Sequence, residues 1–157
     1  MQGSRKRYVE RYERLVRLFE RGMLPWAEWS QRTQLVIGLF YVHRLGFEAG
    51  LQRMRGRLQI YSQIVGIEQD YHETTIVFYM WTLAQFAERH MFVRNFAVLV
   101  ERMFRDPVME PGFLLRHYTP EKLQREDAAR RWLEPDRLLL PEAERRRIRA
   151  ATAALRH

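Results

Sequence analysis

The chain of 157 residues contains no cysteine. Disulfide bonds, cysteine nucleophiles and thiolate metal sites are therefore excluded, and the redox compartment is left open. Lysine is also scarce, because Lys6 and Lys122 are the only two in a chain whose net charge is +8. The positive charge is thus almost entirely arginine. This bias is typical of phosphate recognition, or of arginine-rich codon usage, which we favour.

Long apolar runs are missing as well. Leu35–Val42 is among the longest, and it is far too short to span a bilayer. An amphipathic pattern, and not an apolar signal core, follows the basic start of the chain. We therefore expect no transmembrane segment and a cytoplasmic location. The chain contains no glycine-rich phosphate loop, no GxSxG motif and no HExxH motif, and it identifies no cofactor.

Apolar residues recur at helical spacing along most of the chain, and no strand-like alternation of useful length occurs. The length and the hydrophobic fraction of 46% suit one globular domain with one core. We predict an all-α, single-domain bundle of about five main helices plus short C-terminal helices. The main helices are expected over residues 5–21, 30–44, 47–64, 70–88 and about 92–103.

We assign residues 1–141 to the helical domain. The remaining stretch, 142–157, is highly basic and poor in large apolar groups, so we expect a frayed or solvated tail despite its helical propensity. Within the third predicted helix, Arg53, Arg55 and Arg57 should lie mostly outside, away from its apolar stripe.

The start of the fourth predicted helix is the principal candidate site. Asp70 is a suitable N-cap, and Glu73 would then occupy N3 and complete an arrangement close to a capping box. His72 lies four residues before Ile76 and therefore sits above the apolar stripe. We expect His72 and Glu73 to turn inward, toward the start of an earlier helix.

Several short motifs resemble the pattern of a widespread group of small bacterial helical proteins with no established function. That pattern contains Trp-Thr/Ser followed by two histidines three apart, then Tyr-His-Glu-Thr, and a Trp-Val-Glu-Pro-Asp-like end. The resemblance covers roughly residues 24 to 141. The matching residues are Trp29-Ser30, Tyr71-His72-Glu73-Thr74, His117-Tyr118-Thr119 with Glu121 and Leu123, and Ala129-Arg130 through Trp132-Leu133-Glu134-Pro135-Asp136.

The resemblance implies a shared fold, and the departures from it concern the site. The two family histidines fall on Gln31 and Gln34, and a common threonine falls on Ile76. In the family pattern, two histidines on one helix and a His-Glu pair on another could form a metal or acid–base cluster. Only His72 and Glu73 remain here. Because glutamine is a weak ligand for zinc or iron, we expect no metal site.

We predict a small polar site made by Gln31, Gln34, Tyr71, His72 and Glu73, with Trp29 as a further ligand-binding residue. A helix-start network that satisfies backbone amides would also account for His72 and Glu73. Likewise, Gln31 and Gln34 could form a solvent-facing helix start or a buried amide pair. Trp29 could belong to the core.

Three functions stay open. The first is a binding or regulatory module for a small polar ligand, with a degenerate metal-like or acid–base-like site. The second is an enzyme with His72 as the acid–base group and Glu73 as its orienter. The third is an arginine-rich protein that binds nucleic acid or a protein partner. Nucleic acid is not favoured, because acidic residues interleave with the basic runs and no recognition signature is present.

Overall fold

The computed structural model describes residues 2–153, with side chains from residue 11 onward. Over this part of the chain all regular structure is helical and no strand is present, which confirms the all-α prediction. The α-helices are α1 (Gln2–Glu20), α2 (Gln31–Val65), α3 (Glu73–Arg89), α4 (Phe96–Met103), α5 (Pro120–Leu123), α6 (Glu126–Arg130) and α7 (Glu142–Ala153). Short 3-10 turns are η1 (Trp26–Glu28), η2 (Glu68–Asp70), η3 (Pro107–Met109) and η4 (Leu114–Arg116).

Two of the predicted helices are the two arms of α2, which bends sharply at Gly46. Gly46 has φ 79° and ψ −177°, a backbone conformation that side chains disfavour. The second arm folds back against the first. A Cβ atom at Gly50 would lie 3.1 Å from backbone atoms of Tyr41 and Val42, so the absent side chain permits this close approach. Gly50 therefore permits the close contact between the two arms of α2.

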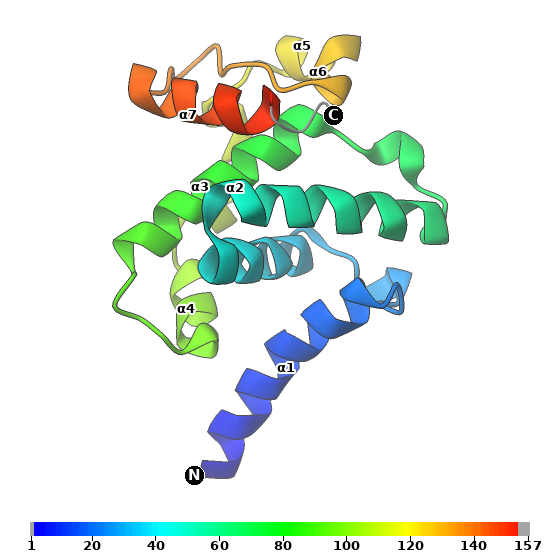
Figure 1. Ribbon diagram of the computed structural model, residues 1–157, viewed down its shortest axis with the longest axis vertical. Coiled ribbons are helices and arrows are strands. Elements are labelled where there is room, and N and C mark those ends of the chain that lie inside the picture. Colours follow the sequence, from blue (N-terminus) through cyan, green and yellow to red (C-terminus); the bar gives the residue numbers. More distant parts are fainter. Residues whose placement is uncertain (1, 154–157) are drawn as a thin grey trace.

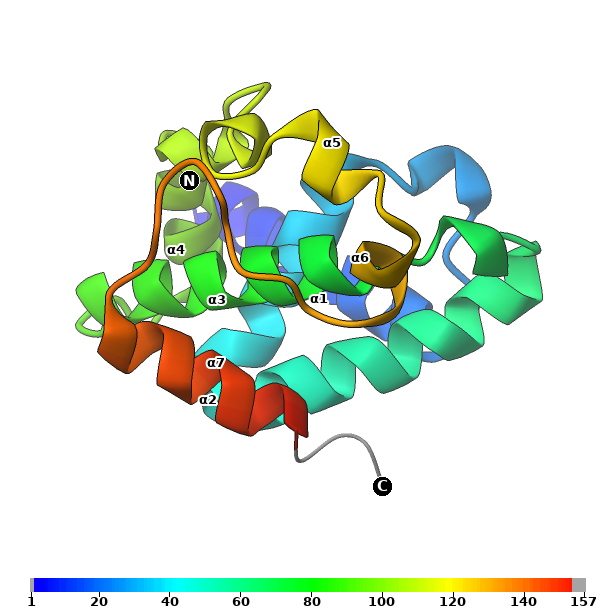
Figure 2. The same ribbon diagram turned by 90° about the horizontal axis from the view of Figure 1, so that it is seen from above.

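α3 occupies the centre of the fold. It packs along α2 on one side, and α5, α6 and α7 cover the other side (Figures 1 and 2). Its side chains are buried on nearly every face because neighbours surround it. Val77, Leu83 and Phe86 are each 1% exposed or less. Figure 1 shows α1 extending away on the side opposite to α7. The start of α3, where the candidate site lies, is thus enclosed by α2 and the C-terminal segments.

The C-terminal stretch corrects one expectation. Glu142–Ala153 is a packed helix, and Ile148 is completely buried in the core. Arg147 bridges two acidic side chains, with its Nε 2.8 Å from Glu48 and its Nη1 3.4 Å from Glu88. The expectation of a solvated tail is therefore wrong for residues 142–153, because the buried side chains of Ile148 and Ala151 and the long-range ion pairs hold the helix against the core. Residues 154–157 lie outside the described residues.

Within residues 2–153, no helix has both the length and the apolar character needed to cross a bilayer.

Candidate functional site

His72, and not Asp70, caps α3. The backbone at His72 is extended (φ −133°, ψ 101°), and its Nδ1 accepts the Thr75 backbone N–H at 3.2 Å. The Thr75 hydroxyl lies 2.9 Å from the same nitrogen. Asp70 instead belongs to η2, so the capping box predicted from Asp70 and Glu73 is not formed. His72 therefore takes the N-cap role that we had predicted for Asp70, and its imidazole satisfies the Thr75 amide.

The other ring nitrogen of His72 is also engaged. Nε2 lies 2.8 Å from the carbonyl oxygen of Leu123, at the end of α5. A carbonyl can only accept, so Nε2 is the protonated nitrogen and Nδ1 is the acceptor toward Thr75. His72 therefore ties the start of α3 to the C-terminal cover, and both of its nitrogens have structural partners.

Glu73 lies in a buried ion pair. Its Oε2 is 2.6 Å from Nη2 of Arg55, and the two side chains are 5% and 18% exposed. The Tyr71 hydroxyl donates to the same oxygen at 3.4 Å. Burial raises the pKa of Tyr71 to about 12, and the Glu73 charge adds to this effect. The prediction that Arg55 lies outside is therefore wrong, because a carboxylate on α3 draws the guanidinium inward.

The electrostatics favour the charged pair. Burial alone would lower the pKa of Arg55, but the hydrogen bond and charge of Glu73 outweigh burial, so this pKa is raised. The cluster is not completely satisfied, because Glu73 Oε1 and Arg55 Nε are buried without a hydrogen-bond partner among the described residues. The pair thus joins the second arm of α2 to the start of α3 at the expense of two unpaired atoms.

A cleft of about 270 Å³ opens beside these contacts, between the start of α2, the end of its second arm and the start of α3. We call it the aromatic cleft. It brings together four of the predicted site residues from separate elements. Its lining consists of Trp26, Trp29, Gln34, Leu58, Ser62, Ile67, Asp70, Tyr71, His72, Thr75 and Ile76.

One wall of the aromatic cleft is held in place by core aromatics. The Trp29 ring stacks on Phe19 with centroids 5.6 Å apart, and its centroid lies 4.7 Å from that of Tyr61. The Tyr61 hydroxyl donates to the Leu24 carbonyl oxygen at 3.1 Å. Trp29 is therefore anchored, whereas Trp26 is 54% exposed at the rim. Trp29, which the sequence predicted as a ligand-binding residue, thus lines the cleft and also packs on the core.

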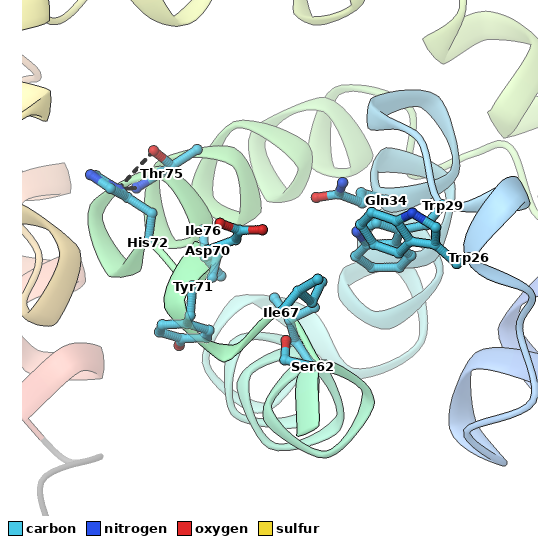
Figure 3. Close-up of a pocket in the computed structure, with 11 residues that line it drawn as sticks. Trp26, Trp29, Gln34, Ser62, Ile67, Asp70, Tyr71, His72, Thr75 and Ile76 are labelled. Atoms are coloured by element: carbon cyan, nitrogen blue, oxygen red, sulfur yellow. Dashed lines mark hydrogen bonds between the residues drawn. The ribbon is translucent and has the colours of Figure 1, made fainter. Parts of the chain in front are cut away.

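Two polar side chains point into the cleft from opposite sides. Figure 3 shows the Asp70 carboxylate and the Gln34 amide directed toward the same open space, while the His72 ring turns away to Thr75. Among the described side chains, Asp70 takes part in no ion pair or hydrogen bond. Sequence reasoning gave Asp70 only a capping role, and its carboxylate is instead free to meet a ligand.

Gln31 and Glu73 lie outside the aromatic cleft. Gln31 lines an adjoining hollow of about 60 Å³ together with Tyr79 and Met80. Burial raises the pKa of Tyr79, and a hydrogen bond with Gln31 opposes the rise. The structure thus places Trp29, Gln34, Tyr71 and His72 around one cleft. It does not unite His72, Glu73 and both glutamines in one cluster.

The motif residues Thr74, Tyr118 and Asp136 have structural contacts. The Thr74 hydroxyl donates to the Arg131 carbonyl oxygen at 2.8 Å and accepts the Leu133 N–H at 3.1 Å. The Tyr118 hydroxyl donates to the Leu133 carbonyl oxygen at 2.6 Å. Asp136 accepts from the Thr119 backbone and hydroxyl. These hydrogen bonds hold the irregular segment that crosses α3 in Figure 2. Residues from three separate motifs thus contribute to one set of structural contacts.

The described residues contain no group of three or more histidine, aspartate and glutamate side chains arranged to hold a metal ion.

The fold and the cleft define an all-α domain with an aromatic, partly acidic cleft. Compared with family models, with curated proteins and with solved structures, the chain matches none of them.

Proposed function

We propose that the protein binds a small organic molecule in the aromatic cleft, and that the ligand has a cationic or strongly hydrogen-bond-donating group. The observation that supports this most directly is the Asp70 carboxylate, which has no partner among the described side chains and faces a space bordered by Trp26, Trp29 and Tyr71. Aromatic faces and a carboxylate together favour an ammonium or guanidinium group. The Gln34 amide adds a second polar contact.

The contacts favour binding over acid–base catalysis. An acid–base pair would require His72 and Glu73 to face a common substrate. Instead, His72 bonds to Thr75 and Leu123, and Glu73 bonds to Arg55. Both predicted catalytic groups thus hold the wall of the cleft, and the ligand would meet the side chains of Asp70, Gln34 and the tryptophans.

A paired-probe experiment tests this proposal. Benzylammonium and its neutral analogue benzyl alcohol are titrated into the protein by calorimetry at low salt. We expect the cation to bind more tightly, and Asp70→Asn to weaken its binding by about fivefold, which corresponds to the loss of about 1 kcal/mol from an ion pair with an exposed carboxylate. The control is Glu68→Gln, which removes the same charge from the same turn without touching the cleft.

Two outcomes would contradict the proposal. One is equal binding of cation and alcohol, which would show that the carboxylate has no part in recognition. The other is equal weakening by Asp70→Asn and Glu68→Gln, which would indicate a diffuse effect of charge. Trp26→Ala should also weaken both probes, because it removes an aromatic wall without changing charge.

A further inference from the structure

A second cleft, of about 500 Å³, lies on the other side of the η1 turn, between α1, the start of α2 and the end of α4. Its lining includes Arg11 and Arg14 from α1 and Arg32 from α2, and we call it the arginine cleft. Figure 1 shows α1 passing along the first arm of α2 at this place. Two helices thus bring three guanidinium groups to one hollow.

These three arginines differ in their ion pairing from most of the basic residues elsewhere in the fold. Arg53 pairs with Glu20, Arg55 pairs with Glu73, and Arg147 pairs with two glutamates. By contrast, among the side chains of residues 11–153, no carboxylate forms an ion pair with Arg11, Arg14 or Arg32. The lining contains one acidic residue, Glu28, so its net charge is three minus one, or +2.

One of the guanidinium groups is held in position. The guanidinium carbon of Arg32 lies 3.8 Å from the centroid of the Phe104 ring, which stacks the planar group against the cleft wall. A group already held there loses less conformational freedom when it binds an anion. The stacking also leaves the N–H groups at the edge of the guanidinium plane available to an acceptor.

The charges converge around Tyr12. Its hydroxyl donates to Glu101 at 2.7 Å. Burial raises the pKa of Tyr12 to about 12, with Glu101 adding to the rise, while the charges of Arg11 and Arg32 act in the opposite direction. Both guanidinium groups, from different helices, are therefore close enough to act on one phenol. Tyr12 stays protonated and adds no negative charge to the cleft.

Hydroxyl groups complete the polar lining. The Ser30 oxygen accepts the Thr33 backbone N–H at 3.1 Å, and its hydroxyl donates to the Thr33 hydroxyl oxygen at 3.1 Å. The Thr33 hydroxyl therefore remains a donor toward the cleft, beside the positive end of the first arm of α2. Phosphate oxygens are the acceptors that such a set of guanidinium and hydroxyl donors suits best.

We propose that the arginine cleft binds the phosphate group of a small phosphorylated molecule, with Arg11, Arg14 and Arg32 as its ligands. The volume exceeds that needed by a phosphate ion alone and lies in the range of small-molecule sites. The apolar part of the lining, including Leu15 and Val36, would contact the organic part of that molecule. This site is separate from the aromatic cleft and does not depend on its ligand.

The test uses pyrophosphate and inorganic phosphate as probes in isothermal calorimetry, with ionic strength held constant by chloride. We expect saturable pyrophosphate binding to the full chain. Arg32→Gln should weaken it by about tenfold, since one bidentate, charge-assisted contact is lost. Arg14→Gln, on a different helix, tests the same site if the Arg32 variant folds poorly.

The matched control is Arg137→Gln. It removes the same charge from an exposed residue in the segment between α6 and α7, far from the cleft in sequence and absent from its lining. Its pyrophosphate affinity should stay within about twofold of the parent value. Asp70→Asn should also leave this affinity unchanged, which separates the site from the aromatic cleft.

Three results would overturn the proposal. Absence of saturable pyrophosphate binding is the first. Equal weakening by Arg32→Gln and Arg137→Gln is the second, because it would indicate a response to net charge alone. The third is salt-sensitive binding of duplex DNA in the absence of pyrophosphate binding, which would assign the arginines to an extended nucleic-acid surface.

Discussion

The buried pair of Arg55 and Glu73 gives the sharpest stability prediction. Replacing Glu73 by leucine leaves the guanidinium, 18% exposed, without its carboxylate partner. Breaking a buried pair from one side costs about 3–5 kcal/mol, and the partial exposure of Arg55 favours the lower end, about 3 kcal/mol. For a domain of this size, such a loss lowers the melting temperature by roughly 6–12 °C.

The double variant Arg55→Met with Glu73→Leu should recover most of this loss, because apolar side chains of similar volume replace both charges and their unpaired atoms. Urea denaturation followed by circular dichroism measures the free energy of unfolding of each variant. Glu126→Gln is the control, since its pair with Arg130 is exposed and should contribute less than about 0.5 kcal/mol. A Glu73→Leu loss no larger than the control, or a double variant as unstable as the single one, would refute this reasoning.

Further predictions concern helix packing, the cap of α3 and pH. Gly50→Ala should destabilise the fold by about 1–3 kcal/mol, because its Cβ would lie 3.1 Å from the Tyr41 backbone. Gly56→Ala should stabilise it by about 0.5–1 kcal/mol, since a Cβ there would meet no atom within 4 Å beyond its own turns of helix. Urea denaturation compares the two variants. His72→Ala should cost about 2 kcal/mol through the lost cap and the lost bond to α5, and His72→Asn should restore about half by capping alone; equal losses would contradict the capping role. Burial lowers the pKa of His117 below 6.5, so the unfolded chain binds a proton at this residue more readily than the folded chain does. The stability that the neutral, buried His117 contributes is therefore present above pH 6.5 and is lost as the pH falls below that value. The fall in unfolding free energy between about pH 8 and pH 5.5 should therefore be smaller in His117→Gln than in the parent protein. An equal fall in both proteins would contradict a role for His117.

The helices themselves were predictable because apolar spacing reports burial directly. The periodicity predicted separate helices over 30–44 and 47–64, and the structure shows that these are the two arms of α2, with the kink at Gly46 between them. The cap of α3 was not predictable in the same way. Asp70 and His72 are both chemically able to cap the helix. In the structure His72 is the cap, and its other ring nitrogen contacts Leu123, a residue distant in sequence that the local pattern does not reveal.

Long-range partners explain the other differences. In the sequence Arg55 is as polar and as far from the apolar stripe as Arg53, and only the position of Glu73 on α3 draws it inward. The C-terminal helix has few apolar side chains, yet Ile148 is completely buried because α7 lies against the core. Of the predicted site residues, Trp29, Gln34, Tyr71 and His72 line the aromatic cleft, and the sequence had singled them out by aromatic character and by the motif resemblance. The role of Asp70 required knowledge of which residue caps the helix.

The four tryptophans offer the most direct test of ligand binding in the aromatic cleft. Trp26 and Trp29 line the cleft, whereas Trp81 and Trp132 are buried elsewhere at 3% and 9% exposure. In a nitrogen-15 NMR titration with benzylammonium, the indole N–H signals of the first two should shift and saturate together. Those of the other two should stay in place. A titration that moves no indole signal, or that moves all four alike, would contradict a ligand site at this cleft.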